Sequence, residues 1–118
     1  NAQGYRVSPQ EVERVLAGAP GVGDVGVTEV EARPGVRIIV AFVVPRVGAV
    51  APADDGDRTA YRQAILTYAA QHLAAYKVPR AVVVMAELPR TANGKILRRE
   101  LPAWWDSSAA TSPGGTPS

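Results

Sequence analysis

Apolar residues near the start of the chain recur with the spacing of one helical face. In the segment SPQEVERVLAGAPG they stand at i, i+3, i+4 and i+7, at Val12, Val15, Leu16 and Ala19. Ser8 is a favourable N-cap, Pro9 suits the first helical position, and Glu11 stands where a capping box requires a carboxylate. Because Gly18 and Pro20-Gly21 interrupt the pattern, it predicts a helix that begins at Pro9 and ends near Gly18.

Two segments rich in β-branched residues follow this helix, VGDVGVTEVE and VRIIVAFVVP. Arg33-Pro34-Gly35 supplies a turn between them, so an antiparallel hairpin is the simple interpretation. The second segment is almost continuously apolar from Val36 to Val44, which is typical of a strand covered on both faces. We therefore expect this strand to be central. A third, short strand is predicted within RAVVVMAEL, residues 80–88.

A second helix is predicted from roughly Arg58 to Tyr76, after the loop RVGAVAPADDGD. Asp57 or Thr59 is expected to cap it. Its apolar line is Tyr61, Ile65, Tyr68, Ala69, Leu73 and Tyr76, and we assign Tyr76 to packing rather than to binding. His72 lies beside that line. No Ser, Cys or acidic residue stands at a triad-like spacing from His72, so we expect a partly buried or surface histidine and not a catalytic base.

The last apolar pattern lies between residues 95 and 105. Lys95 to Leu101 is predicted to form about two helical turns. Its apolar residues are expected to pack inward and its two arginines, Arg98 and Arg99, to point outward; the apolar set is Ile96, Leu97 and Leu101. Trp104 and Trp105 are expected to close the last apolar edge of the core.

These elements predict a small α+β fold in which helices flank a sheet of about three strands. A short extended segment is expected at Tyr5 to Val7. We expect one domain over residues 1–105. Residues 106–118, DSSAATSPGGTPS, contain no large apolar side chain and much Ser, Pro and Gly, which predicts a disordered tail or linker.

Composition narrows the class of protein. The chain has 118 residues and no cysteine, which excludes disulfides and thiolate metal sites and suits a cytoplasmic protein. No apolar run approaches the roughly 20 residues that a membrane helix needs, and no signal peptide is recognisable. The formal net charge is +2, but residues 77–99 hold six basic residues and one acidic residue. This local cationic face suggests an anionic partner.

One lysine stands out within that basic window. Lys95 directly follows Asn93-Gly94 in PRTANGKILRREL, and Asn-Gly favours a turn with positive φ. Gly94 also removes a side chain, which permits close backbone approach by a ligand. Such a turn would hold the root of Lys95 while its ammonium, with three donors and a compact charge, reaches outward. That arrangement suits the stabilisation of negative charge on phosphate and carboxylate oxygens. The same tripeptide also occurs in ordinary surface turns, so Asn93-Gly94-Lys95 alone does not distinguish a catalytic lysine from a surface turn. The motifs elsewhere in the chain are needed to distinguish them.

Three motifs occur in order along the chain: GYRVSPQEVE near the start, LAAYKVPR at residues 73–80, and LPRTANGKILRREL at residues 88–101. Together they resemble the C-terminal domain of adenylate-forming enzymes, the superfamily of acyl-CoA synthetases, aryl-CoA ligases, luciferases and nonribosomal peptide synthetase adenylation domains. The resemblance covers about residues 3–105. It implies a mobile lid domain of an enzyme that joins a carboxylate to AMP with Mg-ATP and then transfers the acyl group to a thiol.

The resemblance implies roles for individual residues. Lys95 matches the lysine that bridges the substrate carboxylate and the nucleotide during adenylation, and Gly94 belongs to the same turn. Gly4, Tyr5 and Arg6 match the segment that turns toward the active site for the thiol step. Two further basic residues, Lys77 and Arg80, match positions that would favour the nucleotide of CoA. We expect no metal ligand in this chain, because the missing domain would hold most of the magnesium contacts.

The chain also departs from the family. The large N-terminal domain with the phosphate-binding loop, the carboxylate pocket and most adenine contacts is absent, and PGVGDVG lacks the ending of a P-loop. We therefore expect a domain of a larger ligase that is inactive alone, with the missing domain, a carboxylic acid, and CoA or a carrier protein as partners.

The motifs look more like those of acyl- or aryl-CoA ligases. The alternative is an adenylation domain that loads the phosphopantetheine of a carrier protein in nonribosomal peptide or polyketide synthesis. A second alternative is a non-catalytic module that binds an anion or another protein. RNA binding is disfavoured because residues 77–99 contain no aromatic residue for base stacking.

Overall fold

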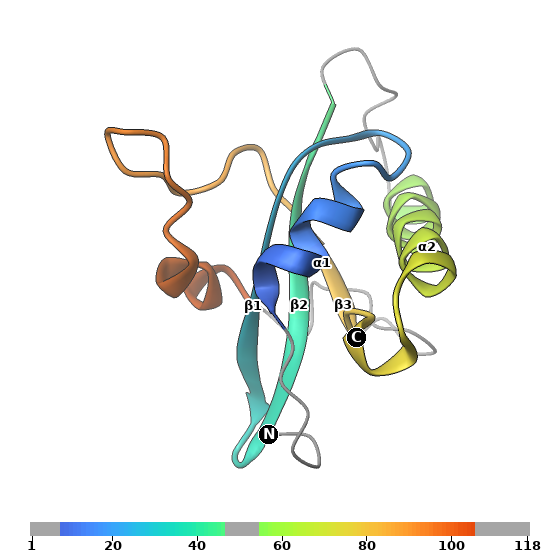
Figure 1. Cartoon of the computed structure of the whole chain (residues 1–118), viewed down its shortest axis with the longest axis horizontal. Coiled ribbons are helices and arrows are strands. Elements are labelled where there is room, and N and C mark those ends of the chain that lie inside the picture. The colour runs from blue at the N-terminus through green and yellow to red at the C-terminus, as the bar shows by residue number, and fades with distance from the viewer. Residues whose placement is uncertain (1–7, 47–54, 106–118) are drawn as a thin grey trace.

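The computed structural model describes residues 8–46 and 55–105, without the side chains of residues 55–57. Along the chain the elements are α1 (Pro9–Leu16), β1 (Val22–Arg33), β2 (Val36–Pro45), α2 (Asp55–His72), a 3-10 helix η1 (Ala75–Lys77), β3 (Ala81–Val84) and a second 3-10 helix η2 (Arg98–Trp104). The predicted α+β class with three strands is confirmed (Figure 1). The expected extended segment at Tyr5–Val7 and the expected tail at 106–118 lie outside the described residues.

The three strands form one sheet in the order β1-β2-β3. β1 and β2 are the predicted antiparallel hairpin, with Val27 opposite Ala41. β2 and β3 run parallel, with Ala41 opposite Val82, and α2 lies in the connection between them. A parallel pair needs such a crossover, since a tight turn cannot join strands that run in the same direction. β2 is therefore central, as its continuous apolar sequence predicted.

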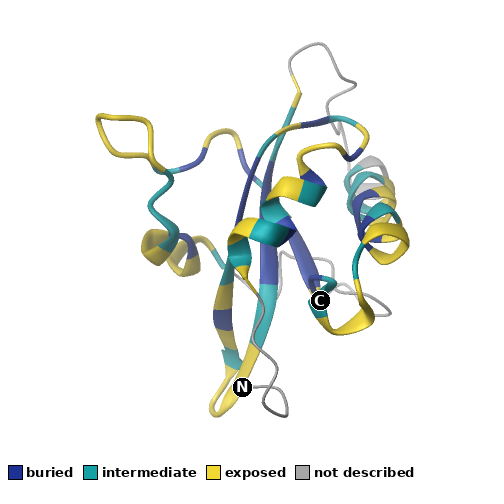
Figure 2. Cartoon of the chain, viewed as in Figure 1, coloured by how far each residue is buried: buried dark blue, intermediate teal, exposed yellow. Residues whose placement is uncertain are grey.

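Each face of the sheet is covered by a different part of the chain. α1 and α2 pack on one face around a core that includes Val25 and Val27 of β1, whereas the segment after β3 packs on the other face around Phe42 (Figure 2). Gly26, between the two valines, points toward this second core. A Cβ placed on Gly26 would lie 3.1 Å from Leu101 and 3.4 Å from Ile96. Ile96 and Leu101 of the C-terminal segment therefore pack directly on the backbone of β1.

The boundaries of the helices differ in part from the prediction. Ser8 caps α1 as expected, because its hydroxyl accepts the amide proton of Glu11 at 3.3 Å. α2 begins at Asp55, so the predicted caps Asp57 and Thr59 were wrong: both lie inside the helix. The predicted end at Tyr76 was also wrong, because α2 ends at His72. Ala74 leaves the helical region with ψ 149°, and the chain then returns toward the sheet.

The predicted helix at Lys95–Leu101 was wrong. Ile96 bridges to Arg90, and the amide of Leu97 donates to the carbonyl of Pro89 at 2.9 Å. Because these bonds close a small hairpin, helical structure begins only at Arg98 and takes the 3-10 form. Leu101 is fully buried as predicted. Of the two tryptophans expected to close the core, Trp105 packs against it, whereas Trp104 is 58% exposed.

Candidate functional site

The segment Pro89–Leu97, which we call the lysine turn, extends away from the sheet in Figure 1. At its base, the bridge between Arg90 and Ile96 pairs the two sides of the turn. Nearer the tip, the amide of Thr91 donates to the carbonyl of Lys95 at 2.8 Å, and the amide of Gly94 donates to the carbonyl of Thr91 at 2.9 Å. These backbone bonds give the turn a defined shape.

Gly94 supplies the conformation that this turn requires. Its φ is +88°, which confirms the prediction of a positive φ after Asn93. A Cβ at Gly94 would meet no atom within 4 Å, so the position needs glycine for its backbone angle and not for space within this domain. The open surroundings leave the backbone of Gly94 accessible from outside.

Lys95 is exposed at the tip of the turn. Its amide donates to the hydroxyl of Thr91 at 3.1 Å, which fixes the root of the side chain. In the described ranges 8–46 and 58–105, where side chains are placed, no carboxylate forms an ion pair with the ammonium of Lys95. A cation with a fixed root and no counter-ion among the described side chains is available to a negative group presented by another domain or a ligand.

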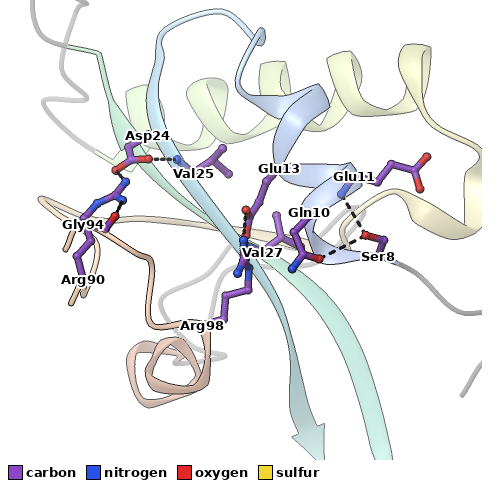
Figure 3. A network of polar contacts seen from close by, with 10 residues as sticks. All are labelled: Ser8, Gln10, Glu11, Glu13, Asp24, Val25, Val27, Arg90, Gly94 and Arg98. Atoms are coloured by element: carbon purple, nitrogen blue, oxygen red, sulfur yellow. Dashed lines mark hydrogen bonds and ion pairs between the residues drawn. The ribbon is translucent and has the colours of Figure 1, made fainter. Parts of the chain in front are cut away.

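Arg90 connects the lysine turn to the sheet (Figure 3). Its Nη1 donates to the carbonyl oxygen of Gly94 at 2.5 Å, and its Nη2 pairs with Oδ2 of Asp24 in β1. The other carboxylate oxygen of Asp24 accepts the amide proton of Val25 at 3.0 Å. The side chain of Arg90 therefore links the tip of the turn to the first residues of β1.

A second arginine fastens the segment farther along the chain. Arg98 donates to Glu13 of α1 from Nε at 2.7 Å and from Nη2 at 2.5 Å, and Oε2 of Glu13 also accepts the amide proton of Val27 at 2.8 Å. The hydrogen bond to Glu13 raises the pKa of Arg98, although partial burial opposes the shift. The expectation that Arg98 points outward was wrong, since the carboxylate of Glu13 draws it against α1. Arg99 is exposed as expected.

The other basic site candidates lie elsewhere. Lys77 donates to both carboxylate oxygens of Glu11, at 2.9 and 3.1 Å, and this hydrogen bonding raises its pKa. Arg80 is exposed, and its amide donates to the carbonyl of Ile39. Tyr76 is 44% exposed, so its assignment to the core was wrong. The ammonium of Lys77 lies 5.6 Å from the Tyr76 ring centroid, in the geometry of a cation–π contact.

The structure does not bring all candidates together. The lysine turn is joined to β1 by the pair of Arg90 with Asp24, at one edge of the sheet. Lys77 in η1 and Arg80 come just before β3, which forms the other edge of the described sheet. Gly4, Tyr5 and Arg6 lie outside the described residues. His72 is exposed and stacks on Tyr68 with ring centroids 4.0 Å apart, as expected for a surface histidine.

In the described part of the chain, no three His, Cys, Asp or Glu residues gather closely enough to hold a metal ion. No helix in this part is both long and apolar enough to cross a membrane.

The sequence predicted Lys95 and Gly94 as site residues, and that assignment stays a prediction. It gave no indication of Asp24 and Glu13, the carboxylates that anchor the segment. Each is paired with an arginine that lies more than sixty residues away, Arg90 at a separation of 66 and Arg98 at 85. Their only sequence signal is an acidic residue beside a buried position, which is common in any amphipathic element.

Comparison with known proteins identifies a family for this chain. The family model of the AMP-binding enzyme C-terminal domain matches residues 11–95, which include the lysine turn up to Lys95. The chain is 35% identical over 112 residues to a dimodular nonribosomal peptide synthase of Bacillus subtilis, covering 95% of this chain and 4% of that protein. It is 41% identical over 98 residues to a 4-chlorobenzoate–CoA ligase of a Pseudomonas species, covering 83% of this chain and 17% of that protein.

Solved structures agree with the sequence relatives. A benzoate CoA ligase from Burkholderia xenovorans superposes with a TM-score of 0.72 at 34% identity, over 81% of this chain and 18% of the other. A fatty acyl CoA synthetase from Mycobacterium tuberculosis superposes with a TM-score of 0.68 at 32% identity, over 86% of this chain and 18% of the other. The chain therefore spans less than a fifth of the length of these relatives, and it belongs to the family of AMP-binding enzyme C-terminal domains.

Proposed function

We propose that this chain acts as the C-terminal lid of an ATP-dependent acid–thiol ligase and that Lys95 supplies the cation for carboxylate adenylation. The observation that carries the proposal is the exposed ammonium of Lys95, which stands on a hydrogen-bonded turn without an ion-pair partner among the described side chains. The relatives support it, since their names include a CoA ligase and a nonribosomal peptide synthase.

In the proposed first step, a carboxylate oxygen of the acid attacks the α-phosphorus of ATP. The new O–P bond forms as the bond to the departing pyrophosphate breaks, and negative charge increases on the oxygens around phosphorus. A magnesium ion, when bound with ATP, would neutralise part of the pyrophosphate charge. The ammonium of Lys95 would donate hydrogen bonds to carboxylate and phosphate oxygens together. Removal of one such preorganised donor typically costs about 2.7–4 kcal/mol.

In the proposed second step, a thiol loses its proton to solvent and its sulfur attacks the carbonyl carbon of the acyl-adenylate. The new C–S bond forms, and AMP leaves as the C–O bond breaks. Lys77 and Arg80 come just before β3, whereas the lysine turn is joined to β1, the strand at the other edge of the described sheet. A lid that used both regions on one active site would have to rotate between the two steps. We assign Gly4, Tyr5 and Arg6 to the passage for the thiol, and Arg80 to the phosphates of its carrier.

Lys77 is a weaker candidate for binding the thiol's carrier, because its ammonium is already held by Glu11. A phosphate would have to replace two hydrogen bonds of 2.9 and 3.1 Å. The acceptor in our proposal is CoA. A carrier-protein phosphopantetheine is the second candidate, favoured by the match to the nonribosomal peptide synthase over 95% of this chain. Supplying the intact enzyme with CoA or with a carrier protein separates the two.

The test uses the intact ligase that contains this domain. Lys95→Ala is expected to lower acyl-adenylate formation by about 100- to 1,000-fold, the usual effect of losing a preorganised donor. Thiol transfer from supplied acyl-adenylate should change little, because that step does not use Lys95. Arg37→Ala, which removes an exposed cation at the far end of the β1–β2 hairpin, is the control and should change neither step. Equal loss of both half-reactions in Lys95→Ala would overturn the assignment.

A second measurement tests whether this chain needs the rest of the ligase in order to bind ATP. We expect the 118-residue chain to bind ATP weakly by itself, with a Kd above about 1 mM, because one cation and a turn carry too few contacts for affinity. Isothermal titration calorimetry measures this directly. A submicromolar Kd would show that this chain contains a nucleotide site of its own.

A further inference from the structure

We propose that Arg90 is a positioning residue for Lys95, acting through the peptide group that joins Gly94 to Lys95. The inference deepens the proposed function and rests on it, because it concerns the placement of the proposed catalytic ammonium. The structure gives Arg90 two partners at once, the carbonyl oxygen of Gly94 and the carboxylate of Asp24 (Figure 3).

The hydrogen bond to Gly94 has a direct geometric effect on Lys95. The carbonyl of Gly94 and the amide of Lys95 belong to one planar peptide group, which moves as a unit. Arg90 holds the oxygen end of this group at 2.5 Å, and the hydroxyl of Thr91 holds its N–H end at 3.1 Å. Rotation of this peptide would swing the Cα of Lys95, and glycine at position 94 would otherwise make such rotation easy.

Asp24 provides the fixed point for this arrangement. It lies in β1, which is paired with β2 from Val22 to Arg33, and its Oδ1 also accepts the amide proton of Val25. An arginine guanidinium is planar and presents its donors at fixed angles, so a contact at one nitrogen orients the other. The tip of the turn is thereby held against the sheet as well as by the backbone bonds of its own segment.

The same contacts contribute little to folding stability. The side chains of Arg90 and Asp24 are 37% and 35% exposed, and pairs exposed to this degree are worth no more than about 1 kcal/mol. The base of the turn is closed independently by the Arg90–Ile96 backbone bridge, which any residue at position 90 can make. For catalysis the expected consequence is larger, because a misplacement of about 1 Å can cost about 100-fold in rate.

The test compares Arg90→Lys with wild type in the intact ligase. Lysine keeps the charge and the backbone bridge but cannot donate at two fixed angles. We expect kcat for acyl-adenylate formation to fall about 10- to 100-fold, with the KM for ATP changed less than about threefold. Thiol transfer from supplied acyl-adenylate should remain within about twofold of wild type. Asp24→Asn, which keeps one acceptor oxygen, should give a smaller loss in the same half-reaction.

Three outcomes would overturn the inference. A raised KM for ATP with unchanged kcat would mean that Arg90 binds the nucleotide directly. Parallel loss of both half-reactions together with a lower Tm would mean that Arg90 only stabilises the fold. An unchanged rate of adenylation in Arg90→Lys, alongside the expected loss in Lys95→Ala, would reject the positioning role and leave the proposed function standing.

A double-mutant cycle ties the effect to Lys95. If Arg90 acts through Lys95, Arg90→Lys should lower the residual rate of the Lys95→Ala enzyme by less than about twofold. An undiminished 10- to 100-fold loss in that background would contradict the inference. Lys95→Ala with full adenylation activity would instead overturn the proposed function, and the inference with it.

Hydrogen exchange supplies a readout besides activity. The amides of Gly94 and Lys95 should exchange faster in Arg90→Lys, and unchanged exchange would contradict the proposal.

Discussion

Two turns in this molecule have nearly the same local design and different surroundings. The hairpin turn, Arg33–Val36, and the lysine turn each contain a glycine with positive φ, +80° at Gly35 and +88° at Gly94. At both glycines an added Cβ would meet no atom within 4 Å. Each turn also stands near an ion pair between arginine and a carboxylate, Arg37 with Glu29 and Arg90 with Asp24.

The difference lies in what each ion pair joins. Arg37 and Glu29 belong to two strands that are paired by backbone hydrogen bonds along their length, and their side chains are 59% and 50% exposed. That pair repeats a connection that already exists. Arg90 and Asp24 join the lysine turn to a strand with which, in the described residues, it shares no backbone pairing. An ion pair contributes most to the relative position of two elements where no backbone hydrogen bonds already join them.

The largest expected contrast comes from valine at the two glycines. A β-branched residue in the left-handed region is strained, at a cost of about 1–2 kcal/mol at either position. In the intact ligase Gly94→Val should lower acyl-adenylate formation by about 100-fold, because the strain is relieved by moving Lys95. Gly35→Val should change that rate less than about threefold, since the hairpin turn carries no proposed site residue. Pyrophosphate exchange measures the adenylation rate of both variants. Equal losses of rate would contradict a special role for the lysine turn.

The next contrast concerns the free energy of unfolding. Glu13 is only 12% exposed and serves both Arg98 and the amide of Val27. Its replacement in Glu13→Ala leaves both donors without their acceptor, which should cost about 2 kcal/mol. Glu29→Ala removes an exposed pair and should cost less than about 0.5 kcal/mol. Urea unfolding of the 118-residue chain compares them. An equal loss of unfolding free energy in the two variants would show that burial does not determine how much these carboxylates contribute to stability.

The smallest contrast removes one side-chain acceptor from each turn. Thr91→Ala deletes the hydroxyl that accepts the Lys95 amide, and a hydrogen bond of about 1 kcal/mol corresponds to about a fivefold loss of adenylation. Thr91→Ser keeps the hydroxyl and should recover most of that activity. Glu31→Ala deletes the carboxylate that accepts the Gly35 amide, and adenylation should not change. Single-turnover rates resolve the difference, and a loss in Thr91→Ser equal to that in Thr91→Ala would contradict the role of the hydroxyl.

The sequence predicted those parts of the fold whose signals are local. Ser8, Pro9 and the apolar spacing from Val12 to Ala19 lie within one helix and its cap, so α1 followed directly. The hairpin followed from two apolar runs separated by Pro34-Gly35, and the continuous run in β2 indicated a strand covered on both faces. The turn before Lys95 was predicted from Asn93-Gly94 in the same way.

The remaining features depend on contacts between distant parts of the chain. The spacing of Ile96 and Leu97 suggested a helix, but the chain forms a bridge there: the amide of Leu97 donates to Pro89, and Ile96 lies opposite Arg90. The partner of Arg98 is Glu13, 85 residues earlier, and any of several carboxylates fits the sequence equally well. These contacts join residues that are far apart in the sequence, so local patterns do not indicate them.

The carboxylate of Glu13 also bears on how copies of this domain behave in solution. Among the residues that the structure describes, β1 is an outer strand of the sheet, and outer strands present free amide and carbonyl groups that can recruit a strand from another molecule. The amide of Val27 is withdrawn from such pairing because Glu13 accepts its proton, and Arg98 neutralises the carboxylate that does so. A neighbouring chain would have to displace the carboxylate of Glu13, and with it the ion pair to Arg98, before it could form a hydrogen bond with the amide of Val27.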